Sequence, residues 1–349
     1  MAAQQIIRAL THAVLPSDVA AFWQDHLAPL KSAEPRGRLI AITPASARAI
    51  TLTIEPNRAF TGFRAGQHIT ISARVNGAWV ARSYSPRLVA GTTSGSFQIT
   101  VQRVTNGRFS QWAHDAASIG DWVKLSEAYG DLVLPENNAD VMMLAAGSVI
   151  TPFLSLLQNM PIERNTSLQY WVKTAEDACH LEELLTLQAR EPKFHFTLHS
   201  TEISERLNAS HLTNCLSGTE IMACGPAGFI ATATALASAQ SLRLQSEAFS
   251  LPMTVSDATK MVNITLARSG KVDQVASGAA LLPALEAQGI TLASGCRRGI
   301  CNTCACSKQQ GISENIITQM RDDGDNPGLR LCISSARSDL TLDLSLRDL

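Results

Sequence analysis

The chain has 349 residues, of which 45% are hydrophobic and 17% are charged, so it is long enough for two or three domains with packed cores. Its formal net charge of −1 argues against a nucleic-acid partner, because phosphate binding needs an excess of basic residues. No secretory signal is recognisable in residues 1–20, and thiols kept for metal suit a reducing compartment, so we expect a cytoplasmic protein.

The chain is predicted to begin with a helical extension, residues 1–36. Ser17 is a suitable N-cap for a helix over residues 18–30, which carries apolar side chains on one face. That face can pack on the rest of the chain or on a partner.

Residues 37–137 are predicted to form an antiparallel β-barrel. Short runs of alternating apolar and polar residues, separated by turn residues, are typical of such a domain. The predicted strands are residues 38–42, 49–54, 68–75, 79–85, 96–104 and 122–126.

Residues 138–250 are predicted to form an α/β domain with a parallel sheet, because apolar strands alternate with helical segments. The predicted strands are residues 141–146, 168–172, 194–199 and 220–223, and the predicted helices are 151–157, 178–190 and 228–237. Residues 251–260 are predicted to be a linker.

One charge-free stretch, residues 141–162, is long enough to cross a bilayer. It contains Gly147, Thr151 and Pro152, and buried parallel strands also form continuous apolar runs. We therefore interpret it as a buried strand, a turn and a helix, and expect no transmembrane segment.

Residues 261–349 are predicted to be a small α+β domain. Strand-like runs at 261–268 and 340–344 accompany one predicted helix at 279–287.

Two motifs in the predicted barrel suit an anionic cofactor. The first is Arg82-Ser83-Tyr84-Ser85: the guanidinium of Arg82 is a fork of donors for a pyrophosphate, Tyr84 can lie against a chain or ring, and Ser85 carries a hydroxyl. The second runs from Gly107 to Ser110 and opens a short helix, whose free N–H groups favour an anion. A surface strand end and a serine-capped turn are the structural alternatives.

A third motif follows the first strand of the predicted α/β domain. Gly147 suits a tight turn, and Thr151 and Pro152 begin the next helix, where a pyrophosphate can bind. Dinucleotide-binding turns often have a second glycine two residues after the first, where the backbone approaches the ligand. Val149 occupies that position here and adds a side chain.

A fourth motif, Cys224-Gly225-Pro226, ends a predicted parallel strand, where open α/β sheets bind ligands. Glu247 and Phe249 stand near the end of the same domain. A solvated glutamate beside a core phenylalanine is the alternative for this last pair.

Four cysteines in the last domain have a spacing that indicates a metal cluster. They are Cys296, Cys301, Cys304 and Cys332, with 4, 2 and 27 residues between successive members. The C-x4-C-x2-C…C spacing is that of a plant-type [2Fe–2S] cluster. A four-cysteine zinc site is the alternative, although zinc sites usually use two C-x2–4-C pairs.

On these residues the chain resembles the ferredoxin–NADP reductase superfamily, with a C-terminal plant-type [2Fe–2S] domain of the β-grasp type. Arg82-Ser83-Tyr84-Ser85 is similar to the family's R-x-Y-S flavin motif, and Cys224-Gly225-Pro226 to its C-G-P motif. The resemblance implies an antiparallel β-barrel that binds FAD rather than FMN, and a parallel-sheet domain that binds NAD(P)H.

The resemblance also implies roles for individual residues. Ser85, Cys224 and Glu247 are expected beside the point of hydride transfer. Residues expected to bind the flavin or the nicotinamide nucleotide are Arg82, Tyr84, Ser85, Gly107, Ser110, Gly147, Thr151, Pro152, Gly225, Pro226 and Phe249. Lys173, after the second strand, slightly favours NADPH, and a solvated lysine is its alternative.

The combination predicts a reductase that passes electrons from NAD(P)H through FAD and the cluster to an external acceptor. The extra N-terminal helix and the run 57–67 look most like those of reductases of membrane acyl-lipid or acyl-CoA desaturases, so a desaturase or hydroxylase is the first expected partner. A soluble Rieske oxygenase or a P450 is the second. A zinc-stapled, non-enzymatic binding module is the alternative of another class. The oligomeric state stays open.

Overall fold

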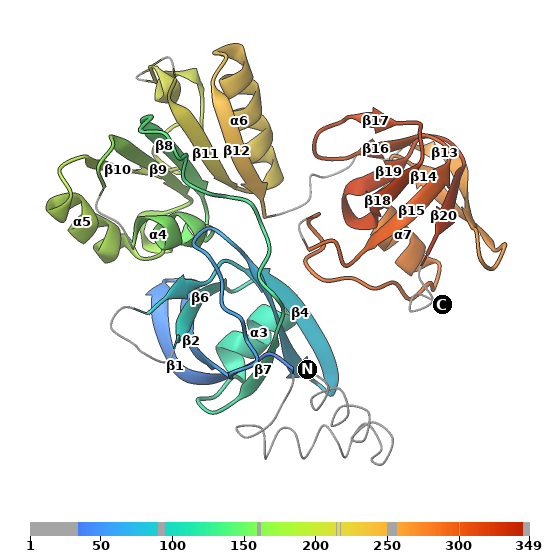
Figure 1. Cartoon of the computed structure of the whole chain (residues 1–349), viewed down its shortest axis with the longest axis horizontal. Coiled ribbons are helices and arrows are strands. Elements are labelled where there is room, and N and C mark those ends of the chain that lie inside the picture. The colour runs from blue at the N-terminus through green and yellow to red at the C-terminus, as the bar shows by residue number, and fades with distance from the viewer. Residues whose placement is uncertain are drawn as a thin grey trace. The chain divides into compact units, whose positions relative to one another are not determined.

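The computed structural model describes residues 34–344 apart from 90–94, 159–161, 214, 217, 250–256 and 300. The predicted helix at residues 18–30 and most of the predicted linker lie outside the described residues. Contacts divide the chain into two compact units, Met1–Asp131 with Thr151–Gln158, and Leu132–Ile150 with Asn159–Leu349. The described residues form four sheets, one in the first part of the chain, one in the middle and two in the C-terminal part (Figure 1).

The first sheet has seven strands, and every hydrogen-bonded pair in it is antiparallel. Its spatial order is β4-β3-β7-β1-β2-β6-β5. The strands are β1 (Arg36–Ser46), β2 (Ala49–Pro56), β3 (Ile69–Val75), β4 (Ala78–Tyr84), β5 (Arg87–Leu88), β6 (Phe97–Gln102) and β7 (Trp122–Leu125).

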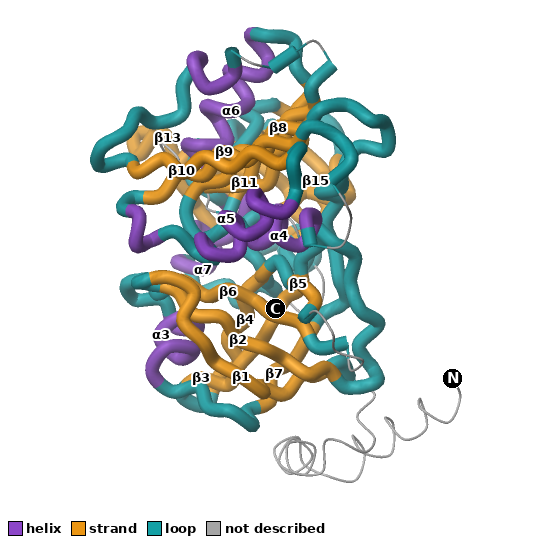
Figure 2. The backbone as a smooth tube through the Cα atoms, turned by 90° about the vertical axis from the view of Figure 1, so that its left-hand side faces the viewer, coloured by secondary structure: helices purple, strands orange, loops and turns teal. Residues whose placement is uncertain are grey.

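This sheet curls around one apolar core. Alternate residues of each strand point inward, so Leu39, Ile71 and Ile99 meet in the interior without solvent exposure. The helix α3 (Arg108–Asp115) contacts β3 and β4 as well as β6, which stand toward opposite ends of the strand order. Figure 2 shows the curled strands with α3 beside them. The predicted antiparallel barrel is confirmed.

The second sheet is parallel throughout, with the order β10-β9-β8-β11-β12. Its strands are β8 (Val141–Ala146), β9 (Thr166–Val172), β10 (Phe194–Ser200), β11 (Glu220–Gly225) and β12 (Arg243–Ala248). The helix α5 (Leu181–Arg190) contacts β10, and α6 (Ala227–Ala239) contacts β11 and β12. All residues of β8 and β11 are buried, which explains the continuous apolar runs at residues 141–146 and 221–224. The predicted parallel sheet is confirmed.

Within the charge-free stretch, residues 141–158 form β8, a turn and the helix α4 (Thr151–Leu157), whose residues are all buried, and residues 159–161 lie outside the described residues. Among the described residues, no helix is both long and apolar enough to cross a membrane. Helix α4 contacts β5 of the first sheet.

The C-terminal part is α+β, as predicted. A five-stranded sheet has the order β14-β13-β20-β15-β18, in which only β13 and β20 are parallel neighbours. A smaller sheet has the order β17-β16-β19, and α7 (Leu281–Ala287) contacts β14 and β19. The strands are β13 (Asp257–Leu266), β14 (Val272–Ser277), β15 (Ala305–Gln310), β16 (Ser313–Asn315), β17 (Arg321–Asp322), β18 (Asn326–Arg330), β19 (Ser334–Ala336) and β20 (Leu340–Asp343).

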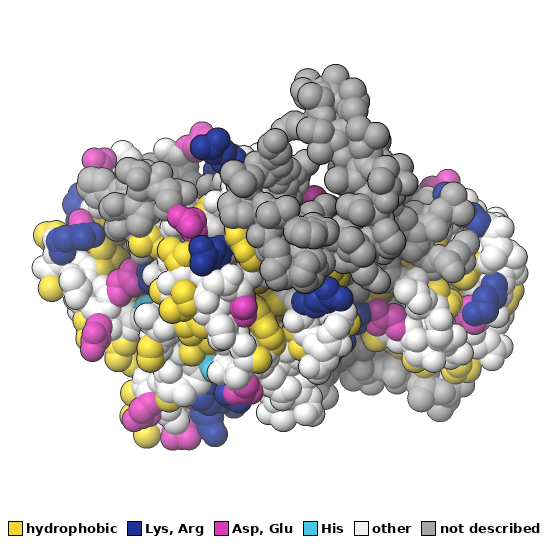
Figure 3. All heavy atoms as spheres, turned by 90° about the horizontal axis from the view of Figure 1, so that it is seen from below, with side chains coloured by type: hydrophobic (Ala, Val, Ile, Leu, Met, Phe, Trp, Pro, Cys, Tyr) yellow, Lys and Arg dark blue, Asp and Glu magenta, His cyan; other side chains and the backbone are white. Residues whose placement is uncertain are grey.

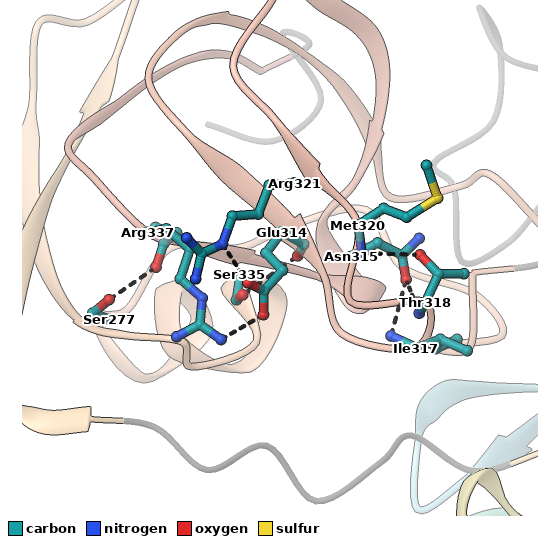
Figure 4. Close-up of polar contacts among 10 residues, drawn as sticks. Ser277, Glu314, Asn315, Ile317, Thr318, Met320, Arg321, Ser335 and Arg337 are labelled. Carbon is teal, nitrogen blue, oxygen red and sulfur yellow. Dashed lines mark hydrogen bonds and ion pairs between the residues drawn. The ribbon is translucent and has the colours of Figure 1, made fainter. Parts of the chain in front are cut away.

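Buried charged groups hold the smaller sheet in place. The ammonium of Lys308 has no solvent exposure and donates to the carbonyl oxygens of Gly311 at 2.9 Å and Asp322 at 2.7 Å. The carboxylate of Glu314 accepts from Arg337 at 2.5 Å and from Arg321 at 2.9 Å (Figure 4). The hydrogen bond from Arg337, followed by that from Arg321, lowers the pKa of Glu314. The buried charges of Lys308 and Glu314 are therefore both hydrogen-bonded.

Surface charges are mixed in sign. On the face drawn in Figure 3, lysine and arginine side chains stand among aspartate and glutamate side chains. This agrees with the net charge of −1.

Candidate active site and cluster centre

The four cysteines of the last domain form two pairs. Cys296 and Cys301 exchange reciprocal contacts, since the backbone N–H of each lies 3.2–3.3 Å from the sulfur of the other. The thiols of Cys304 and Cys332 are hydrogen-bonded to each other. In each pair one thiol has a lowered pKa: hydrogen bonding with the other member of its pair brings that of Cys301 to about 5 and that of Cys304 to about 7.

Two pairs are what a two-iron cluster needs, because each iron takes two cysteine sulfurs. A single zinc ion needs four donors around one point. Within the described part of the chain, no three His, Cys, Asp or Glu side chains are grouped so that they can hold one metal ion. The division into two pairs therefore fits a [2Fe–2S] cluster.

Backbone and hydroxyl donors surround the sulfurs. The N–H of Arg298 lies 3.3 Å from the sulfur of Cys296, and the N–H of Gly299 lies 3.1 Å from that of Cys332. The Thr303 hydroxyl donates to the Cys301 sulfur at 3.1 Å. Such donors stabilise negative charge on thiolates and tune the reduction potential of a cluster.

The cluster loop is held by side chains at two points, Arg297 and Gly299. The Arg297 guanidinium makes a two-point ion pair with Glu286 of α7 at 2.5 and 2.8 Å. The Arg330 guanidinium donates to the carbonyl of Gly299. At Gly299 the backbone φ is +80°, and a Cβ would lie 2.4 Å from a side-chain carbon of Ile333. Glycine is therefore required where the loop passes beside Cys332.

The predicted flavin motif lies at the end of β4. Arg82 and Tyr84 alternate with Ser83 along the strand, and Ser85 follows it directly. The Tyr84 ring packs on Phe109 of α3, with 5.4 Å between ring centroids. Ser85 is buried, and its hydroxyl lies 3.2 Å from Nε2 of His68. A guanidinium, an aromatic ring and a hydroxyl are thus grouped in one short segment, which fits a flavin nucleotide.

The loop before α3 closes on itself. The Ser110 hydroxyl accepts from the N–H of Val104 at 3.1 Å and donates to the carbonyl of Gly107 at 3.0 Å. A Cβ at residue 107 would lie 2.5 Å from the Ser110 oxygen, so only glycine permits this approach. In the described structure the Ser110 side chain therefore shapes the loop, while the start of α3 stays the predicted place for a phosphate.

Three predicted nucleotide-binding residues follow β8. Gly147 has a φ of +76° in the turn, whereas Thr151 and Pro152 begin α4 and are buried. Val149 is half-buried in the same turn.

Strand register brings Cys224 and Glu247 together. Cys224 of β11 is the direct partner of Glu247 on β12 and of Ala145 on β8. Burial raises the pKa of the Cys224 thiol well above its usual value, and the charge of Glu247 raises it further. The thiol is therefore neutral at physiological pH. Cys224 has 0% exposure in this structure, and its neutral thiol is not an activated nucleophile.

The remaining residues of this motif frame the same edge. Gly225 ends β11, and its carbonyl accepts from the N–H of Phe249 at 2.9 Å. Pro226 is the N-cap of α6 and is exposed. The carboxyl edge of the parallel sheet thus holds Gly147, Cys224, Gly225, Glu247 and Phe249.

Lys173 follows β9 at this edge. Its ammonium lies 3.9 Å from the Glu202 carboxylate, and both side chains are more than half exposed. The N–H of Glu202 donates to the carbonyl of Lys173, which holds the two segments together.

Sequence reasoning missed three residues that hold the candidate sites. His68 contacts Ser85, while Glu286 and Arg330 hold the cluster loop. None stands in a recognisable motif, because each comes from another segment of its domain. The only signal in the sequence is His68, an imidazole within a predicted apolar strand.

Comparisons with known proteins agree with this organisation. Residues 40–133 match the model of the oxidoreductase FAD-binding domain, residues 143–235 that of the oxidoreductase NAD-binding domain, and residues 264–337 that of the 2Fe-2S iron-sulfur cluster binding domain.

Named relatives match nearly end to end. The chain is 31% identical to an NADPH oxidoreductase of Mycobacterium tuberculosis, over 98% of this chain and 92% of that protein. It is 25% identical to a carnitine monooxygenase reductase subunit of Acinetobacter baumannii, over 88% and 96%.

Among solved structures, phthalate dioxygenase reductase shares the fold. Its TM-score is 0.62 with 21% identity, over 88% of this chain and 97% of that one. Together, the three domain matches and the end-to-end relative show that this chain belongs to the ferredoxin–NADP reductase superfamily, as an NAD(P)H oxidoreductase with a C-terminal [2Fe–2S] domain.

Proposed function

We propose that the protein takes hydride from NAD(P)H and delivers single electrons from its cluster to an external iron-containing oxygenase. The observation that carries this proposal is the division of Cys296, Cys301, Cys304 and Cys332 into two pairs with N–H donors on their sulfurs. A cluster of this kind accepts one electron at a time, and a bound flavin supplies the conversion from two-electron to one-electron transfer.

Different residues of the chain are proposed to contact each of the three cofactors. Cys224 and Glu247 would border the nicotinamide, with the neutral thiol next to the carboxylate. Arg82, Tyr84 and the start of α3 would hold the flavin, and the Ser85 hydroxyl would face its reactive nitrogen N5. The four cysteines would hold the cluster.

The domain limits are proposed as the sequence predicts them: 1–36 for the extension, 37–137 for the FAD domain, 138–250 for the nicotinamide domain, 251–260 for the linker and 261–349 for the cluster domain. The cytoplasmic location also stays a prediction.

An oxygenase is the acceptor that the relatives support. Carnitine monooxygenase and phthalate dioxygenase are each served by a reductase similar to this chain. The desaturase is the second candidate and depends on the N-terminal helix, which lies outside the described residues, and on the run 57–67. In the structure, residues of that run pack against the first sheet. The Asn57 side chain donates to the Glu34 carbonyl, and the rings of Phe60 and Phe63 pack on Phe97 of β6. These contacts are structural and do not favour either partner.

Anaerobic reduction tests the proposed order of electron flow. When NAD(P)H is mixed with the holoenzyme, the flavin absorbance is expected to bleach first, and the cluster is expected to change next. Stopped-flow absorbance follows the flavin, and freeze-quench EPR follows the reduced cluster. If the cluster is reduced in enzyme stripped of flavin, or a zinc-loaded colourless domain is isolated, the proposal is wrong.

Purified acceptors then separate the two partners. The reductase is expected to support NAD(P)H-dependent turnover of an oxygenase component and not of a membrane desaturase. The reverse result would assign it to a desaturase.

Lys173 is expected to favour NADPH, because its ion pair with Glu202 is exposed and easily exchanged for a 2′-phosphate. Replacing Lys173 with alanine is expected to raise the KM for NADPH about tenfold, equivalent to ~1.4 kcal/mol, with little change for NADH. Lys193→Ala is the matched control. Lys193 directly precedes β10, and its ammonium donates to the carbonyl of Glu163. Equal effects of Lys173→Ala on both nucleotides would exclude this role.

A further inference from the structure

A partly buried ladder of polar side chains lies between β3 and β4. Thr70 and Ser83 are register partners, and Ile69 pairs with Tyr84, so extending this register by one position places His68 opposite Ser85. The hydroxyls of Thr70 and Ser83 lie 3.3 Å apart, and the Tyr129 hydroxyl joins both. His68 has 0% exposure and Ser85 has 2%.

Tyr129 contacts both the backbone and the ring of His68. The His68 backbone N–H donates to the Tyr129 carbonyl at 2.7 Å, and the Tyr129 N–H donates back to the His68 carbonyl at 2.9 Å. The two rings stack, with 6.1 Å between centroids and 23° between planes. Nε2 is therefore held 3.2 Å from the Ser85 oxygen.

We propose that His68 is a positioning residue for hydride transfer, acting through Ser85. This inference rests on the proposed place of Ser85 beside N5 of the flavin. A serine hydroxyl by itself rotates freely, and a hydrogen bond from a fixed ring restricts that rotation.

Histidine suits this position because imidazole either donates or accepts at Nε2, depending on its tautomer. When Nε2 carries the proton, it donates to the Ser85 oxygen and leaves the hydroxyl hydrogen to face an acceptor. When Nδ1 carries the proton, Nε2 accepts from Ser85, whose lone pairs then face a donor. The flavin N5 is an acceptor when oxidised and carries a hydrogen when reduced, so the His68–Ser85 pair matches both states.

Four variants of the full-length holoenzyme test this inference: Ser85→Ala, His68→Leu, the double variant, and His68→Gln, which keeps an amide that can donate or accept. Hydride transfer is measured by stopped-flow bleaching of the flavin. The flavin midpoint potential and visible spectrum are measured without NAD(P)H.

His68→Leu and Ser85→Ala are each expected to slow hydride transfer about tenfold, the rate equivalent of one lost hydrogen bond. The double variant is expected to be no slower than Ser85→Ala, because both changes remove one function. His68→Leu and Ser85→Ala are expected to shift the flavin midpoint potential in the same direction. His68→Gln is expected to keep most of the wild-type rate.

Thr53→Val is the matched control, since it removes a buried hydroxyl of the same sheet that accepts from Gln98 and is not hydrogen-bonded to Ser85 or Tyr129. It is expected to leave the rate and the potential unchanged. If His68→Leu does not retain FAD, His68→Asn decides, because its shorter amide cannot reach Ser85 and is expected to behave like leucine.

The outcomes separate the two proposals. If Ser85→Ala leaves the rate and potential unchanged, Ser85 is not beside N5 and the proposed site is wrong. If Ser85→Ala slows transfer while the His68 variants match the wild type, or if the two changes add independently, the positioning role of His68 is wrong.

Discussion

Replacing Cys332 with serine is expected to stop electron delivery while leaving hydride transfer intact. Cys332 is fully buried, its thiol is hydrogen-bonded to that of Cys304, and its sulfur accepts from the N–H of Gly299. Cys304 and Cys332 are therefore the pair proposed to hold one of the two irons. A serine oxygen is a poor substitute for a thiolate at iron, and the second iron would lose a ligand. NAD(P)H-dependent reduction of the partner is expected to fall by on the order of a hundredfold or more.

The measurements for Cys332→Ser are iron content, EPR of the reduced enzyme, and turnover with two acceptors. Ferricyanide, which takes electrons from flavin, is expected to be reduced at the wild-type rate, and cytochrome c is not. Cys306→Ser is the matched control, because Cys306 is also buried in this domain but lies on β15, two residues beyond Cys304. Full cluster content in Cys332→Ser, or its loss in Cys306→Ser, would refute the ligand assignment.

Replacing Cys224 with alanine is expected to slow hydride transfer roughly a hundredfold, because small displacements of a reacting ring have effects of this size. The thiol lies beside Glu247 at the carboxyl edge of the parallel sheet, and it is neutral, so its proposed role is contact rather than covalent chemistry. The affinity for NAD(P)H is expected to change little, since the nucleotide is held mainly away from the thiol.

Stopped-flow bleaching of the flavin at saturating NAD(P)H measures this effect. Cys215→Ala is the matched control: Cys215 is a half-buried thiol in the same domain whose sulfur contacts the Met142 sulfur. If Cys224→Ala and Cys215→Ala have the same rate, Cys224 has no place in the transfer site.

Elements with a strong apolar pattern were predictable from the sequence. The strand β8 and the helix α4 have the predicted ends, since each is buried along its whole length. The helices α5 and α7 begin later than predicted, at Leu181 and Leu281. For α5 the reason is His180, whose φ of 58° stops the helix from extending backwards.

Weakly patterned strands were not predictable. The edge strand β12 has no fully buried residue and gains its hydrogen bonds only from β11. The strands β14–β19 of the last domain are short and mostly polar, so neither length nor alternation distinguishes them from loops. Their existence depends on partners that are distant along the chain.

The kinds of cofactor were predictable from the sequence, because cofactor chemistry demands particular residue types at short, regular spacings, as in Arg82–Ser85 and in the cysteine set. Which of these residues meet became visible only in the folded chain. It paired Cys304 with Cys332, set Cys224 beside Glu247 and placed His68 behind Ser85. The physical reason is that strand register and loop closure depend on interactions between distant segments, and no local spacing records them.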